Sequence, residues 1–132
     1  ICLGMQLLFH SSDEGEVAGL SILEGHLETL SAGIGKNSRT PPNIGYNFVE
    51  FSRGESQNGI SDDLNGYYYF IHSYALKTKP IRNCEFATSL FNGECFYSFF
   101  MRENICGIQF HPERSGTRGL LLISRIINLM KK

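Results

Sequence analysis

Hydrophobic and polar residues alternate most clearly in the middle and the last third of this 132-residue chain. Residues 43–51 alternate as a strand does, and the aromatic run at 67–76 is the strongest strand signal. Further strand patterns follow at 85–91, 94–101 and 105–110. Asn92-Gly93 and Glu103-Asn104 separate them, and an Asn-Gly pair between strands favours a tight hairpin. The sequence therefore predicts an antiparallel meander in this part of the chain.

Helical patterns lie at the two ends of the chain. Residues 3–9 predict a short helix that begins directly after Cys2, and the polar segment 11–16 closes it. A second helix is expected from about Thr117 to the end of the sequence. Its predicted buried face consists of Leu120, Ile123, Ile127 and Met130. The polar segments at 33–43 and 53–66 predict surface loops.

Composition argues against binding to nucleic acid or membranes and against a cysteine metal site. A formal net charge of −1 offers no basic surface for nucleic acid or an anionic membrane. No apolar run approaches the roughly 18 to 20 residues of a membrane span, so a cytoplasmic protein is expected. The four cysteines lack metal-like spacing and predict reduced thiols without a metal site. Cys84, Cys95 and Cys106 are expected to be small buried apolar side chains, which leaves Cys2 as the chemical candidate.

Cys2 stands where a nucleophile would be activated. It directly precedes the first predicted helix, and a helix N-terminus lowers the pKa of a thiol. The backbone N–H of Leu3 would then face a developing oxyanion, and Gly4 would relieve crowding at a sharp turn.

His111 and Glu113 supply the other parts of a possible relay. Pro112 between them keeps His111 out of the helical region, so both side chains can emerge on one side. We expect His111 to exchange a proton with the Cys2 thiol and the leaving amine, while Glu113 selects the imidazole tautomer. His10 and His26 are expected to be surface or packing residues.

Two motifs together carry a family resemblance. Ile-Cys-Leu-Gly-Met-Gln at 1–6 and Gly-Ile-Gln-Phe-His-Pro-Glu at 107–113 resemble the class I, or triad-type, glutamine amidotransferases. Segments 42–47, 69–74 and 109–115 are similar to the HisH family, the glutaminase subunits of imidazole glycerol phosphate synthase. The resemblance implies a flavodoxin-like three-layer α/β fold. Residues 1–132 would be its C-terminal portion, with mixed and antiparallel strands and a C-terminal helix, and without the N-terminal strands and the oxyanion strand.

The resemblance also implies an activity. Cys2 would attack L-glutamine to form a γ-glutamyl thioester, and glutamate and ammonia would be released without a cofactor. Gln6 and the segment His72, Ser73 and Tyr74 would hold the substrate. In the family, ammonia passes to a (β/α)₈-barrel partner, a HisF-like subunit of a heterodimer. That subunit makes imidazole glycerol phosphate and aminoimidazole carboxamide ribotide in histidine biosynthesis.

The partner interface is where the chain departs from the family. The corresponding loop is Asn43, Ile44, Gly45, Tyr46 and Asn47, with Asn43 and Tyr46 in place of His and Trp. These substitutions would suit a paralogous glutaminase that supplies ammonia for acetamidino groups on bacterial surface sugars. The sequence is also compatible with a non-catalytic docking or regulatory module and with a cysteine hydrolase of related fold. Without the oxyanion strand, the activity of residues 1–132 alone would be compromised.

Overall fold

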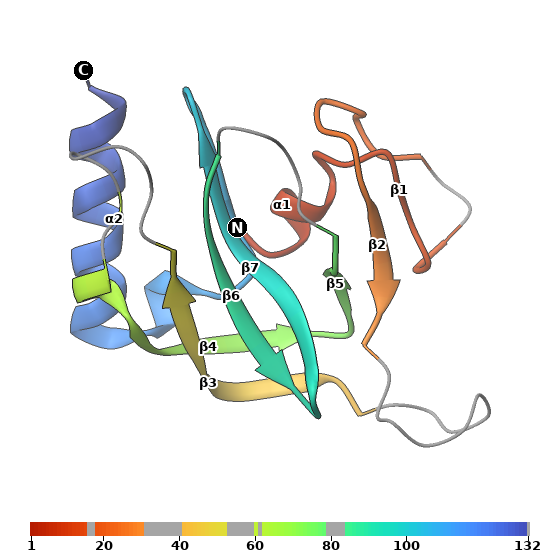
Figure 1. Cartoon of the computed structure of the whole chain (residues 1–132), viewed down its shortest axis with the longest axis horizontal. Helices are drawn as coiled ribbons and strands as arrows, with labels where there is room; N and C mark the ends of the chain where they lie inside the picture. Colours follow the sequence, from red (N-terminus) through yellow and green to blue (C-terminus); the bar gives the residue numbers. More distant parts are fainter. Residues whose placement is uncertain (16–17, 31–40, 53–59, 61, 79–83, 132) are drawn as a thin grey trace.

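The computed structural model describes residues 1–15, 18–30, 41–52, 60, 62–78 and 84–131 (Figure 1). These residues form an eight-stranded sheet in the order β1-β2-β5-β7-β6-β3-β4, with β8 paired to β7. The strands are β1 (Ser11–Ser12), β2 (His26–Thr29), β3 (Asn43–Phe51), β4 (Gly66–His72), β5 (Tyr74–Leu76), β6 (Glu85–Phe91), β7 (Glu94–Arg102) and β8 (Ile105–Ile108). Helix α1 (Leu3–Gln6) and helix α2 (Gly116–Met130) complete the α/β architecture that the sequence predicts.

The predicted meander is confirmed. Strands β6, β7 and β8 pair antiparallel in sequence order. Asn92 and Gly93 connect β6 to β7, and both have positive φ angles, 50° and 82°. Asparagine and glycine adopt this backbone region at low cost, which is why their pairing predicts a hairpin.

The aromatic run at 67–76 forms two strands rather than the single strand predicted. The strand is interrupted at Ser73, whose carbonyl accepts a hydrogen bond from Leu30 N–H at 2.9 Å. Strand β4 pairs with β3 over its whole length, whereas β5 pairs with β2 and β7. The pattern of side chains continues through the break, so the change of partner strand leaves no signal in the sequence.

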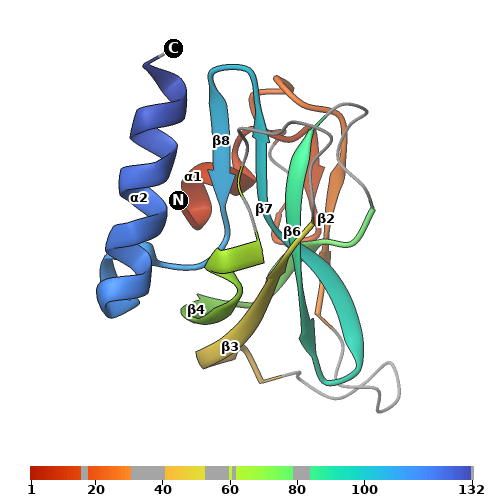
Figure 2. The ribbon, with the colours of Figure 1, turned by 60° about the vertical axis from the view of Figure 1, so that its left-hand side comes forward.

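Helix α2 buries a different face from the predicted one. Gly119, Leu122 and Ile126 are buried, whereas Leu120, Ile127 and Met130 are exposed. The helix is amphipathic, with a wide apolar arc that includes both the predicted and the observed buried residues, so helical periodicity allows both solutions. A close approach at Gly119 decides between them, because a Cβ there would collide with the backbone oxygen of Pro112. Figure 2 shows α2 beside β8 at one end of the molecule.

Two apolar clusters hold the helices to the sheet. The larger lies between α2 and strands β3, β4, β6 and β7, and its members include Tyr68, Phe70, Phe99, Phe110 and Leu122. The smaller lies beneath α1 and contains Met5, Phe9, Leu27 and Phe100. Helix α1 is shorter than the predicted 3–9, but Met5 within the helix and Phe9 beyond its end are both buried in this cluster. The packing thus fixes the position of the residue just before α1, Cys2.

Candidate active site

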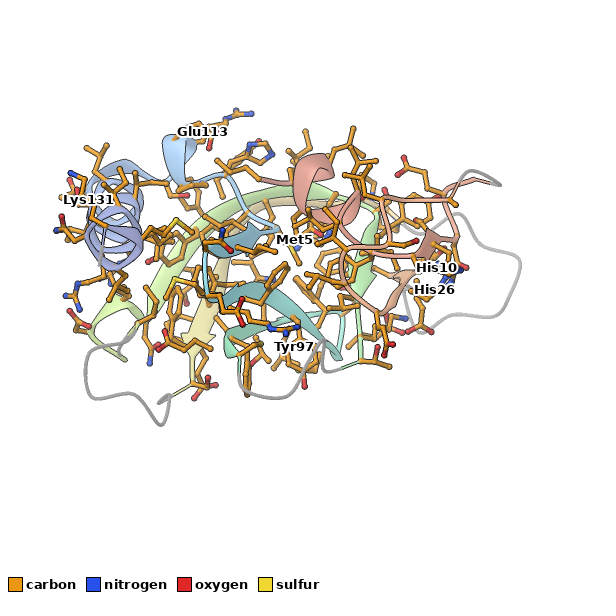
Figure 3. The ribbon with its side chains drawn as sticks, turned by 90° about the horizontal axis from the view of Figure 1, so that it is seen from above. Met5, His10, His26, Tyr97, Glu113 and Lys131 are labelled. Carbon is orange, nitrogen blue, oxygen red and sulfur yellow. The ribbon has the colours of Figure 1, made fainter. Side chains whose placement is uncertain are left out.

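The two ends of the sequence meet at Cys2. Its N–H donates to the carbonyl of Ile108 at 2.6 Å, which ties the start of α1 to the end of β8. Cys2 has φ 47° and ψ −115°, a sparsely populated conformation for a residue with a side chain. The sharp turn predicted at the nucleophile is therefore present. Seen from above in Figure 3, α1 and Glu113 lie on the same side of the sheet.

The thiol of Cys2 lies between a donor and an acceptor. The amide nitrogen of Gln109 donates to its sulfur at 3.8 Å, and the sulfur faces the carbonyl of Ile71 at 3.8 Å. Burial raises the pKa of the thiol, although the N–H of Leu3 opposes the shift, and the carboxylates of Glu113 and Glu14 add to it. The prediction of a lowered pKa is wrong for this structure, since the four residues of α1 do not outweigh desolvation.

The explanation proposed for Gly4 is also wrong. A Cβ at this position would meet no atom within 4 Å among the described residues, so crowding at the turn does not require glycine here.

His111 and Glu113 are in direct contact, as their spacing predicts. Nδ1–H of His111 donates to a carboxylate oxygen of Glu113 at 2.6 Å. His111 is extended, with φ −105° and ψ 92°, but Glu113 reaches back from a 3-10 turn (Pro112–Arg114) rather than from a strand. Burial raises the pKa of Glu113, but the hydrogen bond from His111, the backbone N–H of Glu113 and nearby positive charge together outweigh burial, so the net pKa is lowered. The contact leaves Nε2 of a neutral His111 free to accept a proton.

Nε2 of His111 has no partner. Within the part of the chain that the structure describes, it is the one buried side-chain nitrogen or oxygen without a hydrogen bond. The predicted relay is thus half formed, because His111 contacts Glu113 while the Cys2 sulfur faces Ile71 and Gln109.

Ser115 supports the turn that carries this pair, a role that its local sequence does not indicate. Its hydroxyl donates to the carbonyl of His111 at 2.6 Å and accepts the N–H of Tyr69 at 3.0 Å. The N–H of His111 donates to the carbonyl of Tyr69 at 2.8 Å. The turn is thereby fixed to β4.

A cavity of about 290 Å³ opens beside Cys2. The residues predicted to hold substrate all line it, together with the nucleophile: Cys2, Leu3, Gln6, Glu14, Pro42, Ile44, Ile71, His72, Ser73 and Tyr74. Glu14 is predicted only as part of a polar loop, because nothing in its local sequence places it at a cavity. A second cavity of about 230 Å³ adjoins the first, since Leu3, Gln6 and Glu14 line both; it is mostly apolar, and its lining contains neither Cys2 nor His72.

His72 is a fixed neutral residue in the wall of the cavity beside Cys2. Its Nδ1–H donates to the carbonyl of Tyr74 at 2.9 Å, and its Nε2 lies 3.0 Å from the amide nitrogen of Asn43. Burial lowers the pKa of His72 to about 4. Asn43 is predicted at a partner interface, but it is only 3% exposed because the inward side of β3 begins there.

The outer side of β3 and β4 carries exposed and half-buried apolar residues that we call the aromatic ladder. It consists of three cross-strand pairs between β3 and β4: Ile44 with Ile71, Tyr46 with Tyr69, and Phe48 with Tyr67. The ring centroids of the two aromatic pairs are 5.6 and 5.4 Å apart. The ladder joins the turn of Glu113, because Arg114 lies over the ring of Tyr69 at 4.1 Å and the Tyr46 hydroxyl donates to the Arg114 carbonyl at 2.9 Å.

The described ranges contain no candidate metal cluster, no helix able to span a membrane and no disulfide. They contain no group of three or more His, Cys, Asp or Glu side chains placed to hold a metal ion. No helix among them has the length and apolarity to cross a membrane. None of the four cysteines forms a disulfide. Cys95 is exposed, contrary to expectation, whereas burial raises the pKa of Cys106 to about 12.

Comparison with known proteins gives concordant matches. The profile of the family "Glutamine amidotransferase class-I" matches residues 1–125. The chain is 38% identical to the HisH subunit of imidazole glycerol phosphate synthase from Pyrobaculum aerophilum, over all of this chain and 63% of that protein. It is 38% identical to the HisH subunit from Thermotoga maritima, over 96% of this chain and 56% of that protein.

A chloroplastic relative from Arabidopsis thaliana, imidazole glycerol phosphate synthase hisHF, is 38% identical over 97% of this chain and 21% of its own length. The chain spans 56% to 63% of the length of the two HisH relatives. The profile match extends over nearly the whole chain and includes Cys2, His111 and Glu113. The chain therefore belongs to the class-I glutamine amidotransferase family.

Proposed function

We propose that the protein carrying this chain is the glutaminase subunit of an imidazole glycerol phosphate synthase. It hydrolyses L-glutamine to glutamate and ammonia through Cys2, His111 and Glu113. A (β/α)₈-barrel, HisF-like subunit uses the ammonia to make imidazole glycerol phosphate and aminoimidazole carboxamide ribotide in histidine biosynthesis. Family membership and the identity to HisH subunits support this assignment. The observation that carries the chemistry is the buried, unpartnered Nε2 of His111, on the same ring whose Nδ1–H is bound to a carboxylate.

The chemical steps follow from that nitrogen. A buried polar atom without a partner costs about 1–3 kcal/mol, so a site that retains one gains something in exchange. Nδ1 is occupied by Glu113, so Nε2 carries the lone pair and accepts the thiol proton of Cys2. The sulfur then attacks the side-chain carbonyl carbon of glutamine, and the N–H of Leu3 donates to the oxyanion. His111 returns the proton to the leaving nitrogen, which departs as ammonia, and later activates the water that hydrolyses the thioester.

The cavity suits an amino-acid substrate. Glu14 places a carboxylate in its lining, which would pair with the α-ammonium group of glutamine. Gln6 and the segment His72 to Tyr74 supply its polar walls. We therefore assign Gln6, His72, Ser73 and Tyr74 to substrate binding, with Glu14 added from the geometry.

The aromatic ladder supports the proposed barrel partner. Tyr46 is 61% and Tyr67 62% exposed, and both lie in one continuous row on the face of a two-stranded ribbon. Contiguous exposed apolar side chains of this kind are typical of interaction surfaces. The ladder contacts the turn that holds Glu113, so a partner seated there would touch the catalytic turn directly. Ile44, Gly45, Tyr46 and Asn47 remain interface predictions, whereas Asn43 faces inward.

The test is glutamate release from glutamine by the complete natural protein that carries this sequence. It is measured alone and with the barrel subunit of the same organism, with and without the ribonucleotide substrate of that barrel. Stimulation by the barrel and ribonucleotide together supports the full proposal. Glutamate release that ignores the barrel contradicts the pathway and favours an enzyme that adds acetamidino groups to surface sugars.

A pair of variants separates the ladder from general surface effects. Tyr67→Lys should weaken stimulation by the barrel and leave glutamate release without it unchanged, because the Tyr67 ring packs on Phe48 at the end of the ladder away from the Glu113 turn. Leu20→Lys changes an equally exposed apolar residue outside the ladder and serves as the control. Equal effects of both substitutions on stimulation would contradict the assignment of the ladder to the partner.

A further inference from the structure

We propose that Gln109 is a positioning residue for the nucleophile, which holds the Cys2 sulfur through a donor N–H whose direction is set by a chain of hydrogen bonds from the Tyr74 carbonyl. This inference rests on the proposed role of Cys2 as the nucleophile. Gln109 has no exposed surface, lies 107 residues from Cys2 in the sequence, and places its amide nitrogen 3.8 Å from the thiol sulfur.

The direction of the Gln109 amide follows from one fixed acceptor. A backbone carbonyl can only accept, so the group of Gln6 that lies 3.1 Å from the Tyr74 oxygen is its amide nitrogen. The same nitrogen lies 3.1 Å from Gln109, which must therefore present its amide oxygen to Gln6. The amide nitrogen of Gln109 is thereby turned toward the Cys2 sulfur, at 3.8 Å.

The Tyr74 carbonyl also orders the opposite wall of the cavity. It accepts Nδ1–H of His72 at 2.9 Å, which leaves Nε2 of that ring to accept from Asn43 at 3.0 Å. Two chains of hydrogen bonds, which we call arms, thus start at the Tyr74 carbonyl on β5. One runs through Gln6 and Gln109 to Cys2, and the other runs through His72 to Asn43. The side chains that form the arms, Gln6, Gln109, His72 and Asn43, are buried, which limits the access of water to their bonds.

The two partners of the sulfur respond differently to ionisation. A neutral thiol can accept from Gln109 and donate to the Ile71 carbonyl at the same time. A thiolate has no proton, so the carbonyl of Ile71 repels it while the N–H groups of Gln109 and Leu3 attract it. Loss of the proton therefore releases the sulfur from Ile71 while Gln109 still holds it. The carboxylates that act on the thiol are those of Glu14 and Glu113, and both oppose ionisation.

The experiment measures the ionisation of Cys2 directly. The complete protein is alkylated with iodoacetamide across a range of pH, and modification of the Cys2 peptide is followed by mass spectrometry. Gln109→Glu keeps an acceptor for Gln6 but turns a carboxylate toward the sulfur. We expect its alkylation midpoint to rise by at least about one pH unit, a tenfold loss of thiolate at a fixed pH. Gln109→Met removes the donor without adding charge and should give a smaller shift in the same direction.

Ser98→Ala is the matched control. Ser98 is fully buried and its carbonyl accepts the N–H of Gln109 at 2.9 Å, but its hydroxyl bonds to Ser89 and Ala87 rather than to the site. Its alkylation midpoint should match that of the unmodified sequence. Unchanged midpoints in folded Gln109 variants, or an equal shift in Ser98→Ala, would overturn the proposal.

A measurement on the unmodified sequence covers the case in which a Gln109 variant does not fold. In ¹⁵N-labelled protein, the side-chain amide signals of Gln109 should shift with the same pH midpoint as Cys2 alkylation. The shift should be absent in Cys2→Ala. Amide signals that do not follow the thiol would overturn the proposal. Alkylation does not require glutamine turnover, so this result is separate from the glutaminase test.

Discussion

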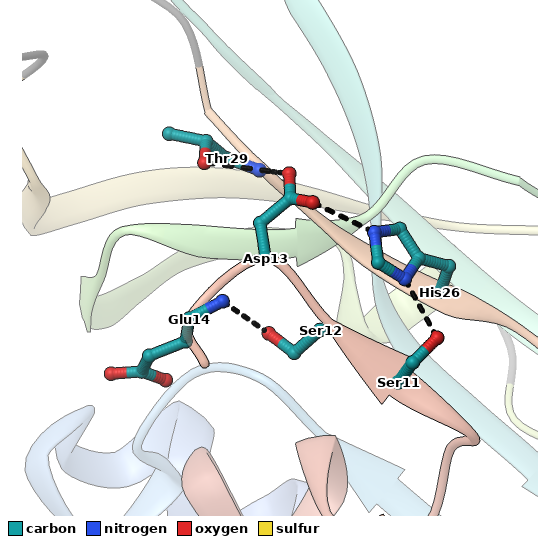
Figure 4. Close-up of polar contacts among 6 residues, drawn as sticks. All are labelled: Ser11, Ser12, Asp13, Glu14, His26 and Thr29. Carbon is teal, nitrogen blue, oxygen red and sulfur yellow. Dashed lines mark hydrogen bonds and ion pairs between the residues drawn. The ribbon is translucent and has the colours of Figure 1, made fainter. Parts of the chain in front are cut away.

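Two histidine–carboxylate pairs in this molecule have nearly the same hydrogen-bond length, but they differ in whether the second ring nitrogen has a partner. His111 donates to Glu113 at 2.6 Å, and His26 donates to Asp13 at 2.8 Å. The second nitrogen of His26 lies 2.8 Å from the Ser11 hydroxyl, so Ser11, His26 and Asp13 have the composition of a hydrolase triad (Figure 4). The second nitrogen of His111 is buried and has no hydrogen-bond partner among the residues that the structure describes.

The difference shows that the hydrogen bonds already made by a histidine indicate whether it can act as a base better than the types of its neighbouring residues do. Every polar group of the His26 cluster has a partner, since the second carboxylate oxygen of Asp13 accepts the N–H of Thr29 at 3.0 Å. His26 is also 46% exposed and lies at the end of the sheet away from Glu113 (Figure 3). We interpret the cluster as a clasp between β2 and the segment that follows β1. His111 instead retains an unused lone pair beside a turn that other residues hold in place.

Removing the free imidazole or the thiol should give the largest effect. In the complete protein, His111→Gln and Cys2→Ser should each lower glutamate release about 10⁴-fold or more, because each removes a group that the acyl transfer requires. His26→Gln is the matched control and should leave the rate unchanged. A comparable loss in His26→Gln would erase the distinction between the two pairs.

Glu113→Gln tests the carboxylate alone. The amide can still contact Nδ1 of His111 but no longer stabilises the imidazolium or selects its tautomer. We expect glutamate release to fall on the order of 10²-fold, less than for His111→Gln because Glu113 is half exposed and water can replace part of its role. Asp13→Asn makes the same change in the other pair and should not alter the rate.

A third histidine, His72, differs from the other two because its burial should make the stability of the protein depend on pH. The pKa of His72 is lowered by burial to about 4, below the value of about 6.5 in an unfolded chain. Between these values the unfolded state binds more protons, so stability falls as the pH is lowered from 6.5 to 4. The loss is roughly 3 kcal/mol at about 1.36 kcal/mol per pKa unit. Urea unfolding across this range should show a smaller loss in His72→Gln, and an identical pH dependence in both proteins would contradict the burial argument.

The smallest effect is expected at the clasp. The pKa of Asp13 is lowered by the Thr29 N–H and by His26, so its contribution is present above the unfolded pKa and is lost as the pH falls through the folded pKa. Asp13 is 44% exposed, so Asp13→Asn should cost less than about 1 kcal/mol at neutral pH. Thermal unfolding at neutral and acidic pH measures this difference. A cost of several kcal/mol would mean that the clasp supports far more of the fold than its exposure indicates.

Much of the candidate site could be predicted from local sequence. Pro112 keeps His111 extended, Asn92-Gly93 forms the predicted hairpin, and Cys2 directly precedes a helix. Each of these features depends on the backbone preferences of adjacent residues, which the sequence states directly. The buried face of α2 and the break at Ser73 were mispredicted, because both depend on packing against segments remote in sequence.

The sequence by itself thus determined the family, the chemical groups at its two ends and most element boundaries. Tertiary structure alone decided which atoms are left without a partner and which way each amide points. Gln6 and Gln109 acquire their direction from the Tyr74 carbonyl, and the distinction between His111 and His26 rests on one buried nitrogen. The physical reason is that backbone preference is local, whereas burial and hydrogen-bond satisfaction depend on partners as far as 107 residues away.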